Sequence, residues 1–162
     1  MFTQQNLEVF LKEHLPVQLN KLHPQLTPRW GQMNVQQMTE HLSLTFLMAT
    51  GQFKVKLTTD AEKIPVFKRY LMDPSKDFPQ NFQNPLLPAA PIPVTTAGLN
   101  EARTGLMQSV EKFFVFFTEN PAAVTLNNVW GELNYLEWMV MNYKHIKHHF
   151  AQFGIALSAM DG

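Results

Sequence analysis

Three histidines, His145, His148 and His149, stand close together in a chain that contains six histidines and no cysteine. On a helix, a spacing of four residues places His145 and His149 one turn apart on the same face, where both imidazoles can bind one divalent ion. Because cysteine is absent, any metal must be held by histidines and carboxylates. The segment is therefore the first candidate for a metal site.

A metal site with one open position needs a third nitrogen ligand. His41 is the best candidate, because it shares a helix face with Met38 and Thr45 in another segment with a strong helix signal. If the two helices are neighbours, the imidazoles of His41, His145 and His149 converge. The alternatives are a core histidine bonded to a carbonyl and a polar patch at a helix end.

Helical phase separates the remaining polar groups. His145 and His149 share the apolar stripe of their helix, whereas His148 and Asn142 lie on its flanks. Both flanking residues are candidates for orienting a substrate or a metal ligand. Glu40 is a weaker candidate, because the helical wheel places it about 100° from its neighbour His41.

Other catalytic motifs are missing. A zincin-type His-Glu-x-x-His motif is excluded, since Ile146 and Lys147 follow His145. Neither histidine-bearing helix contains the Glu-x-x-His pair of ferritin-like di-iron sites. The sequence also lacks a glycine-rich phosphate loop and a Gly-x-Ser-x-Gly elbow. Catalysis without a metal would have few groups available to it.

Apolar periodicity and capping signals predict helices, and therefore an all-α protein. Asn34 and Asn134 are the expected N-caps of the two histidine-bearing helices, and Gln37 and Glu137 complete capping boxes. The expected helices cover residues 3–22, 34–51, 61–71, 95–120 and 134–154. The first has a kink or break at Pro16, and the third is short. Thr95 and Thr96 are the expected caps of the fourth.

The two histidine-bearing helices are preceded by similar residues. Trp30-Gly31 stands before Asn34, and Trp130-Gly131 stands before Asn134. Glycine permits a tight approach, and the apolar residue before each asparagine can act as a hydrophobic staple. We expect two helix starts built in the same way.

Prolines concentrate between the second and third main helices. Seven of the eleven prolines fall between Pro65 and Pro93, and such a stretch is too long for an ordinary connection. We expect an irregular excursion over about residues 73–95 that either packs over an opening as a lid or is partly mobile. The whole chain, residues 1–162, is interpreted as a single domain.

Composition excludes several classes of protein. Charged residues make up 16% of the chain, and 13 basic residues balance 13 acidic ones, so neither nucleic acid nor an anionic membrane is an expected partner. The charge-free stretch 78–100 contains five prolines and is expected to be a loop. The first residues lack a basic, apolar leader, which favours a cytoplasmic protein.

The helix surface at residues 113–117 is apolar on nearly all sides, which suggests a subunit contact there.

The chain resembles the DinB-like superfamily, also called YfiT-like, of metal-dependent enzymes, and within it a branch of unknown function. The resemblance rests on residues 30–42 (WGQMNVQQMTEHL), 130–138 (WGELNYLEW) and 142–154 (NYKHIKHHFAQFG). It implies an up-down-down-up four-helix bundle, often dimeric, in which His41, His145 and His149 bind zinc, nickel or a similar ion. The proline-rich excursion is distinctive, and residues 125–128 stand where relatives often carry His-Pro.

Two functions follow as hypotheses. The first is a metal-dependent enzyme, a hydrolase or a thiol transferase, whose open coordination position takes water or a low-molecular-weight thiol. The resemblance implies the thiol alternative, because some members transfer bacillithiol or isomerise maleylpyruvate with mycothiol. The second is a module that binds a metal or a partner without catalysis. A homodimer with a small-molecule substrate is expected in the first case.

Overall fold

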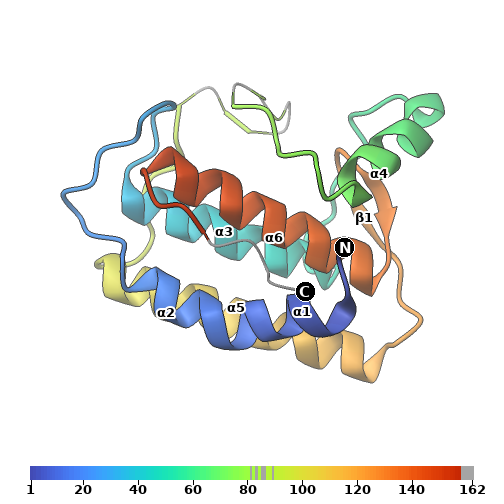
Figure 1. Cartoon of the computed structure of the whole chain (residues 1–162), viewed down its shortest axis with the longest axis horizontal. Coiled ribbons are helices and arrows are strands. Elements are labelled where there is room, and N and C mark those ends of the chain that lie inside the picture. The colour runs from blue at the N-terminus through green and yellow to red at the C-terminus, as the bar shows by residue number, and fades with distance from the viewer. Residues whose placement is uncertain (81, 83, 85–86, 89, 158–162) are drawn as a thin grey trace.

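The computed structural model describes residues 1–80, 82, 84, 87, 88 and 90–157, and it is mostly helical (Figure 1). Its helical elements are α1 (Gln4–Val9), η1 (Phe10–His14), α2 (Leu15–Leu19), α3 (Val35–Ala49), η2 (Ala61–Lys63), α4 (Ile64–Met72), α5 (Leu99–Glu119) and α6 (Tyr135–Gln152). The short helix expected at 61–71 is present as η2 and α4, and Pro65 lies in its first turn, where proline is tolerated.

The N-terminal helix is the continuous run of α1, η1 and α2. Instead of a sharp break at Pro16, the turn before it widens into the π-helix η1, closed by a hydrogen bond from the Leu15 amide to the Phe10 carbonyl. Proline has no amide hydrogen, and its ring collides with the carbonyl four residues earlier. A wider turn relieves that collision without ending the helix.

The capping boxes at the starts of α3 and α6 are present. The Asn34 side chain accepts from the Gln37 amide at 2.8 Å, and the Gln37 side chain accepts from the Asn34 amide at 3.0 Å. Asn134 and Glu137 make the same pair of bonds at 3.0 and 2.9 Å. These local bonds fix where both histidine-bearing helices begin.

The expected cap of α5 is wrong. Gly98 is its N-cap, and no side chain caps the helix. Thr95 and Thr96 instead donate their amides and hydroxyls to the carboxylate of Glu40 on α3, at 2.6 to 3.1 Å. Burial raises the pKa of Glu40, but the bonds from Thr96 and Thr95 outweigh it and hold the pKa at about 2. Glu40 therefore anchors the connection that leads into α5.

The all-α expectation is also wrong in one place. β1 (Thr125–Asn127) and β2 (Gly131–Leu133) form an antiparallel hairpin between α5 and α6. The Asn127 side chain accepts hydrogen bonds from the amides of Val129 and Trp130, and Gly131 takes a φ of 78°. A turn that needs a left-handed residue favours glycine, which explains the hairpin at this point.

The main helices enclose one hydrophobic core. In Figure 1, α3 and α6 lie side by side, with the N-terminal helix and α5 below them in that view. α3 makes its most extensive contact with α5 and also packs on α6, which in turn packs on α1. The largest fully buried side chains include Trp138, Phe46, Phe113 and Phe150. The pairing of α3 with α6 is what brings the histidines together.

The aromatic face of α5 is partly used inside the chain. Phe113 and Phe117 are buried and pack against Tyr135, with ring centroids 5.7 and 5.1 Å apart. Val115, by contrast, is 50% exposed. The described helices include none with the length and hydrophobicity needed to cross a bilayer.

Candidate metal centre

Three imidazoles from two helices meet in the structure. The Nε2 atom of His145 lies 3.0 Å from Nε2 of His41 and 3.0 Å from Nε2 of His149. His41 comes from α3 and the other two from α6. The ligand-type atoms of the three residues all lie within 4.8 Å of one another. The structure therefore brings together the three residues that the sequence predicted as ligands.

Gln152 fixes the proton of His149. Its Nε2 donates to the carbonyl of Trp30 at 2.6 Å, so its Oε1 is the atom that faces Nδ1 of His149 at 2.9 Å. An amide oxygen only accepts, and His149 must therefore carry its proton on Nδ1. The Nε2 atom of His149 is left with a free lone pair, as a metal ligand requires.

The neighbours of His145 do not satisfy the hydrogen-bonding capacity of its imidazole. Its Nε2 faces both His41 and His149, but a single proton on that atom can serve only one of them well. Its Nδ1 is buried and has no hydrogen-bond partner among the described residues. A cation between the three Nε2 atoms would remove the conflict, so the donor set fits a divalent ion.

The spacing also suits such an ion. Metal–nitrogen bonds of about 2.0–2.1 Å place two ligands roughly 3.3 Å apart at a tetrahedral angle and roughly 2.9 Å apart at a right angle. The observed separations of 3.0 Å lie between these values. At this spacing the Nε2 atoms of His41 and His149 can each share an ion with that of His145.

Electrostatics keeps the three imidazoles neutral. Burial lowers the pKa of His41 to about 4 and the pKa of His149 to about 3. Burial also holds the pKa of His145 well below its usual range, and the adjacent His149 and His41 lower it further. A neutral imidazole is the form that binds a metal.

These lowered pKa values predict a pH dependence for the metal-free protein. The unfolded histidines bind protons below about pH 6.5 and the folded ones do not, so stability is full above that pH and falls as the pH decreases. Each neutral histidine removes about 1.4 kcal/mol of unfolding free energy per pH unit. Urea unfolding between pH 7.5 and 5.0, above most carboxylate titration, measures this slope.

Two variants check the assignment. His41→Gln removes one titrating group and is expected to flatten the slope by about one proton. His23→Gln, which changes an exposed histidine outside the cluster, is the control variant. Equal slopes for the parent and His41→Gln would show that His41 is already protonated in the folded protein.

The histidines open onto a large cavity. Its volume is about 1130 Å³, and His41, His145 and His149 all contribute to its wall. Seven aromatic residues also line it: Trp30, Phe53, Phe67, Tyr70, Phe78, Phe82 and Trp130. An apolar cavity with a few converging polar groups is typical of a binding site for small molecules.

The chain was compared with protein families, curated proteins and solved structures. No family model, curated protein or solved structure matches the chain.

The three other candidate residues have different positions. His148 lines the cavity, and its ring meets that of Trp30 edge to face at 5.9 Å. Burial lowers the pKa of His148, and a hydrogen bond with the Phe78 backbone opposes this effect only in part. Asn142 is completely buried, and its Oδ1 accepts from the Thr45 hydroxyl. Glu40 is held by the threonines described above, so only His148 has access to the cavity.

The expected excursion at 73–95 contributes to the cavity wall. Its described members at the wall are Phe78, Pro79, Gln80, Phe82, Asn84 and Leu87; residues 81, 83, 85, 86 and 89 lie outside the described part. The Phe78 ring stacks on Trp130 at 5.3 Å and lies 6.5 Å from the ring of His145. This arrangement supports the lid alternative.

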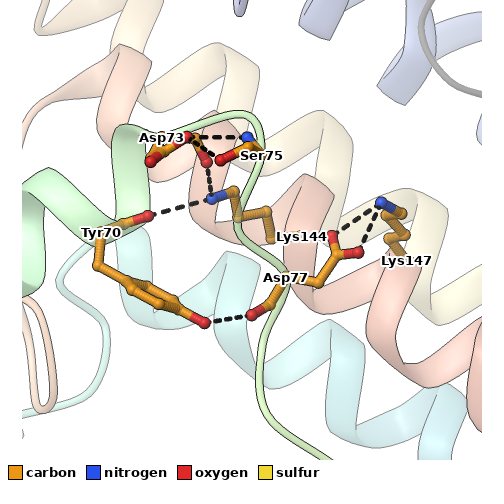
Figure 2. A network of polar contacts seen from close by, with 6 residues as sticks. All are labelled: Tyr70, Asp73, Ser75, Asp77, Lys144 and Lys147. Atoms are coloured by element: carbon orange, nitrogen blue, oxygen red, sulfur yellow. Dashed lines mark hydrogen bonds and ion pairs between the residues drawn. The ribbon is translucent and has the colours of Figure 1, made fainter.

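Two lysines of α6 hold the covering segment, residues 73–80, in place (Figure 2). Lys144 donates to the carbonyls of Asp73 and Tyr70 at 2.7 and 3.3 Å. Lys147 pairs with Asp77 at 2.7 Å. The Tyr70 hydroxyl also donates to the Asp77 carbonyl. The covering segment, which contains Phe78, is therefore fastened to the helix that carries two of the three histidines.

Lys144 is unusual among these groups because only 2% of it is exposed. Burial lowers its pKa to about 8, although Asp77 and Asp73 act to raise it. These roles of Lys144 and Lys147 were not predicted. Residues 144, 147 and 148 are spaced to share one helix face, but the partners Asp73 and Asp77 lie 71 and 70 residues away in the sequence.

Proposed function

We propose that the protein is a metal-dependent enzyme, of the hydrolase or thiol-transferase type, with His41, His145 and His149 as ligands of zinc or nickel. The observation that carries the proposal is the meeting of three Nε2 atoms in the wall of a 1130 Å³ cavity. The resemblance to DinB-like proteins, with their up-down-down-up four-helix bundle, supports it. The proposal includes a small-molecule substrate, a cytoplasmic location and a homodimer that uses the outer side of α5.

A divalent ion bound here would lower the pKa of water or of a thiol, making either a nucleophile near neutral pH. Gln152 keeps Nε2 of His149 free for coordination by binding its Nδ1–H. The aromatic walls exclude water from an apolar substrate. None of the described residues that line the cavity is acidic, so His148 is the side chain best placed to accept a proton there.

The test begins with metal content. Protein purified without a nickel column is loaded with zinc or nickel, and metal is quantified alongside two assays, hydrolysis of an activated ester and displacement of chloride from an activated chloroarene by a thiol. We expect turnover in one assay to follow metal occupancy and to be lost in His145→Ala. Full occupancy without turnover would favour the non-catalytic metal-binding module. Failure to bind either metal would overturn both functions.

A further inference from the structure

The walls of the cavity next to the histidines carry charge of one sign. Among the described residues, the charged ones that line it are Lys54 and Lys56, because the imidazoles of His41, His145 and His149 are neutral. None of the acidic residues within the described part of the chain lies among the lining residues. Both lysines are exposed, and neither forms an ion pair with a described residue.

The segment that carries these lysines is attached to the hairpin. The Thr58 amide and hydroxyl both donate to the carbonyl of Asn128, at 2.7 and 2.9 Å. Lys56 lies only two residues before this attachment. The segment is therefore attached to the hairpin just after Lys56.

The hairpin contributes an uncharged donor to the same cavity. Asn127 is 4% exposed and lines the wall. Its Oδ1 accepts from the amides of Val129 and Trp130, which identifies the other terminal atom as the NH2 group. That NH2 group has no hydrogen-bond acceptor among the described residues.

A second donor is unpaired as well. The Nε1 atom of Trp30 is buried without a partner in the described part of the chain, and Trp30 lines the cavity. The Trp30 Nε1 atom is the buried donor of the set, and a buried donor without an acceptor is costly. Lys54, Lys56, Asn127 and Trp30 all offer hydrogens, and no carboxylate among the described lining residues can accept them.

We propose that this cavity binds an organic anion, a compound with an apolar, preferably aromatic, body and one anionic group. The seven aromatic side chains of the wall suit the body, and the lysines and the Asn127 amide suit the charge. The inference deepens the proposed function, on which it rests, by giving the class of its substrate.

Calorimetry with a matched pair of probes tests the inference. Naphthalene-2-carboxylate and naphthalene-2-carboxamide have nearly the same shape and differ in charge. Two exposed lysines are expected to favour the carboxylate by about twofold to thirtyfold. The titrations are done on the protein as isolated and after removal of metal with chelator, so that direct binding of carboxylate to metal is separated from the effect of the lysines.

The decisive variant is Lys54→Gln/Lys56→Gln, in which the preference should fall below about twofold. Lys21→Gln/Lys112→Gln is the matched control, because it makes the same change in net charge at exposed residues outside the cavity. Equal binding of the two probes, no binding of either, or a preference that survives in Lys54→Gln/Lys56→Gln would overturn the inference. Metal loading of the same samples separates the two proposals: failure to bind either zinc or nickel counts against the enzyme, and absence of a lysine-dependent preference for the carboxylate counts against the anion.

Discussion

Replacing His145 with alanine is expected to lower the affinity of the protein for zinc by at least about a hundredfold, because loss of an outer partner of a ligand alone costs about 10–100-fold. His145 is the central member of the cluster, with Nε2 atoms of both other histidines 3.0 Å from its own. Its removal leaves two ligands on different helices. Competition with a chromophoric zinc chelator measures the affinity.

The same variant has a distinctive effect on stability. With zinc at a thousand times its dissociation constant, the parent gains about 4 kcal/mol of unfolding free energy, and a hundredfold weaker site gains about 1.4 kcal/mol. Without metal, His145→Ala removes a buried, unpartnered Nδ1 atom, so we expect it to lose less than about 1 kcal/mol. His148→Ala is the control and should keep the zinc affinity of the parent. Zinc binding by His145→Ala equal to that of the parent would refute the three-histidine site.

Replacing Gly31 with alanine is expected to weaken zinc binding by about tenfold without touching a ligand. Gly31 has a φ of 79°, and a Cβ atom there would overlap the Gln152 side-chain amide. Gln152 must then move, which breaks its bonds to the Trp30 carbonyl and to Nδ1 of His149. The imidazole of His149 loses the group that fixes its proton and its orientation.

Gly131→Ala provides a matched control. Gly131 has nearly the same φ, 78°, but a Cβ atom there would meet Ile64 at 2.9 Å, away from the histidines. Both variants should lose about 1–2 kcal/mol of unfolding free energy from the left-handed backbone, and only Gly31→Ala should lose zinc affinity. Equal zinc affinities for the two variants would show that Gln152 does not support the site.

The parts of the fold that could be predicted from the sequence depend on short-range signals. The starts of α3 and α6 follow from Asn34 and Asn134, whose partners are three residues away. The phase of α6 then placed His145 and His149 on one face. Candidate ligands could thus be selected by helical geometry, and His41 by the same reasoning on α3.

The parts that could not be predicted depend on partners distant in sequence. Thr95 is a good local cap, but it binds Glu40, 55 residues away. The bond from Gln152 to Trp30 spans 122 residues, and the clamp from Lys144 to Asp73 spans 71. The hairpin was missed because strands of three residues are too short to show alternation. Such contacts become visible only after the helices are placed.

The Trp-Gly pairs that precede α3 and α6 affect the intrinsic fluorescence of the protein. Of the three tryptophans in the chain, Trp30 and Trp130 line the cavity. Trp138 is fully buried in the core, with its Nε1 donating to the Thr125 hydroxyl. The ring of Trp30 meets His148, and that of Trp130 stacks on Phe78 of the covering segment. The intrinsic fluorescence of the protein therefore contains two reporters of cavity occupancy and one internal reference.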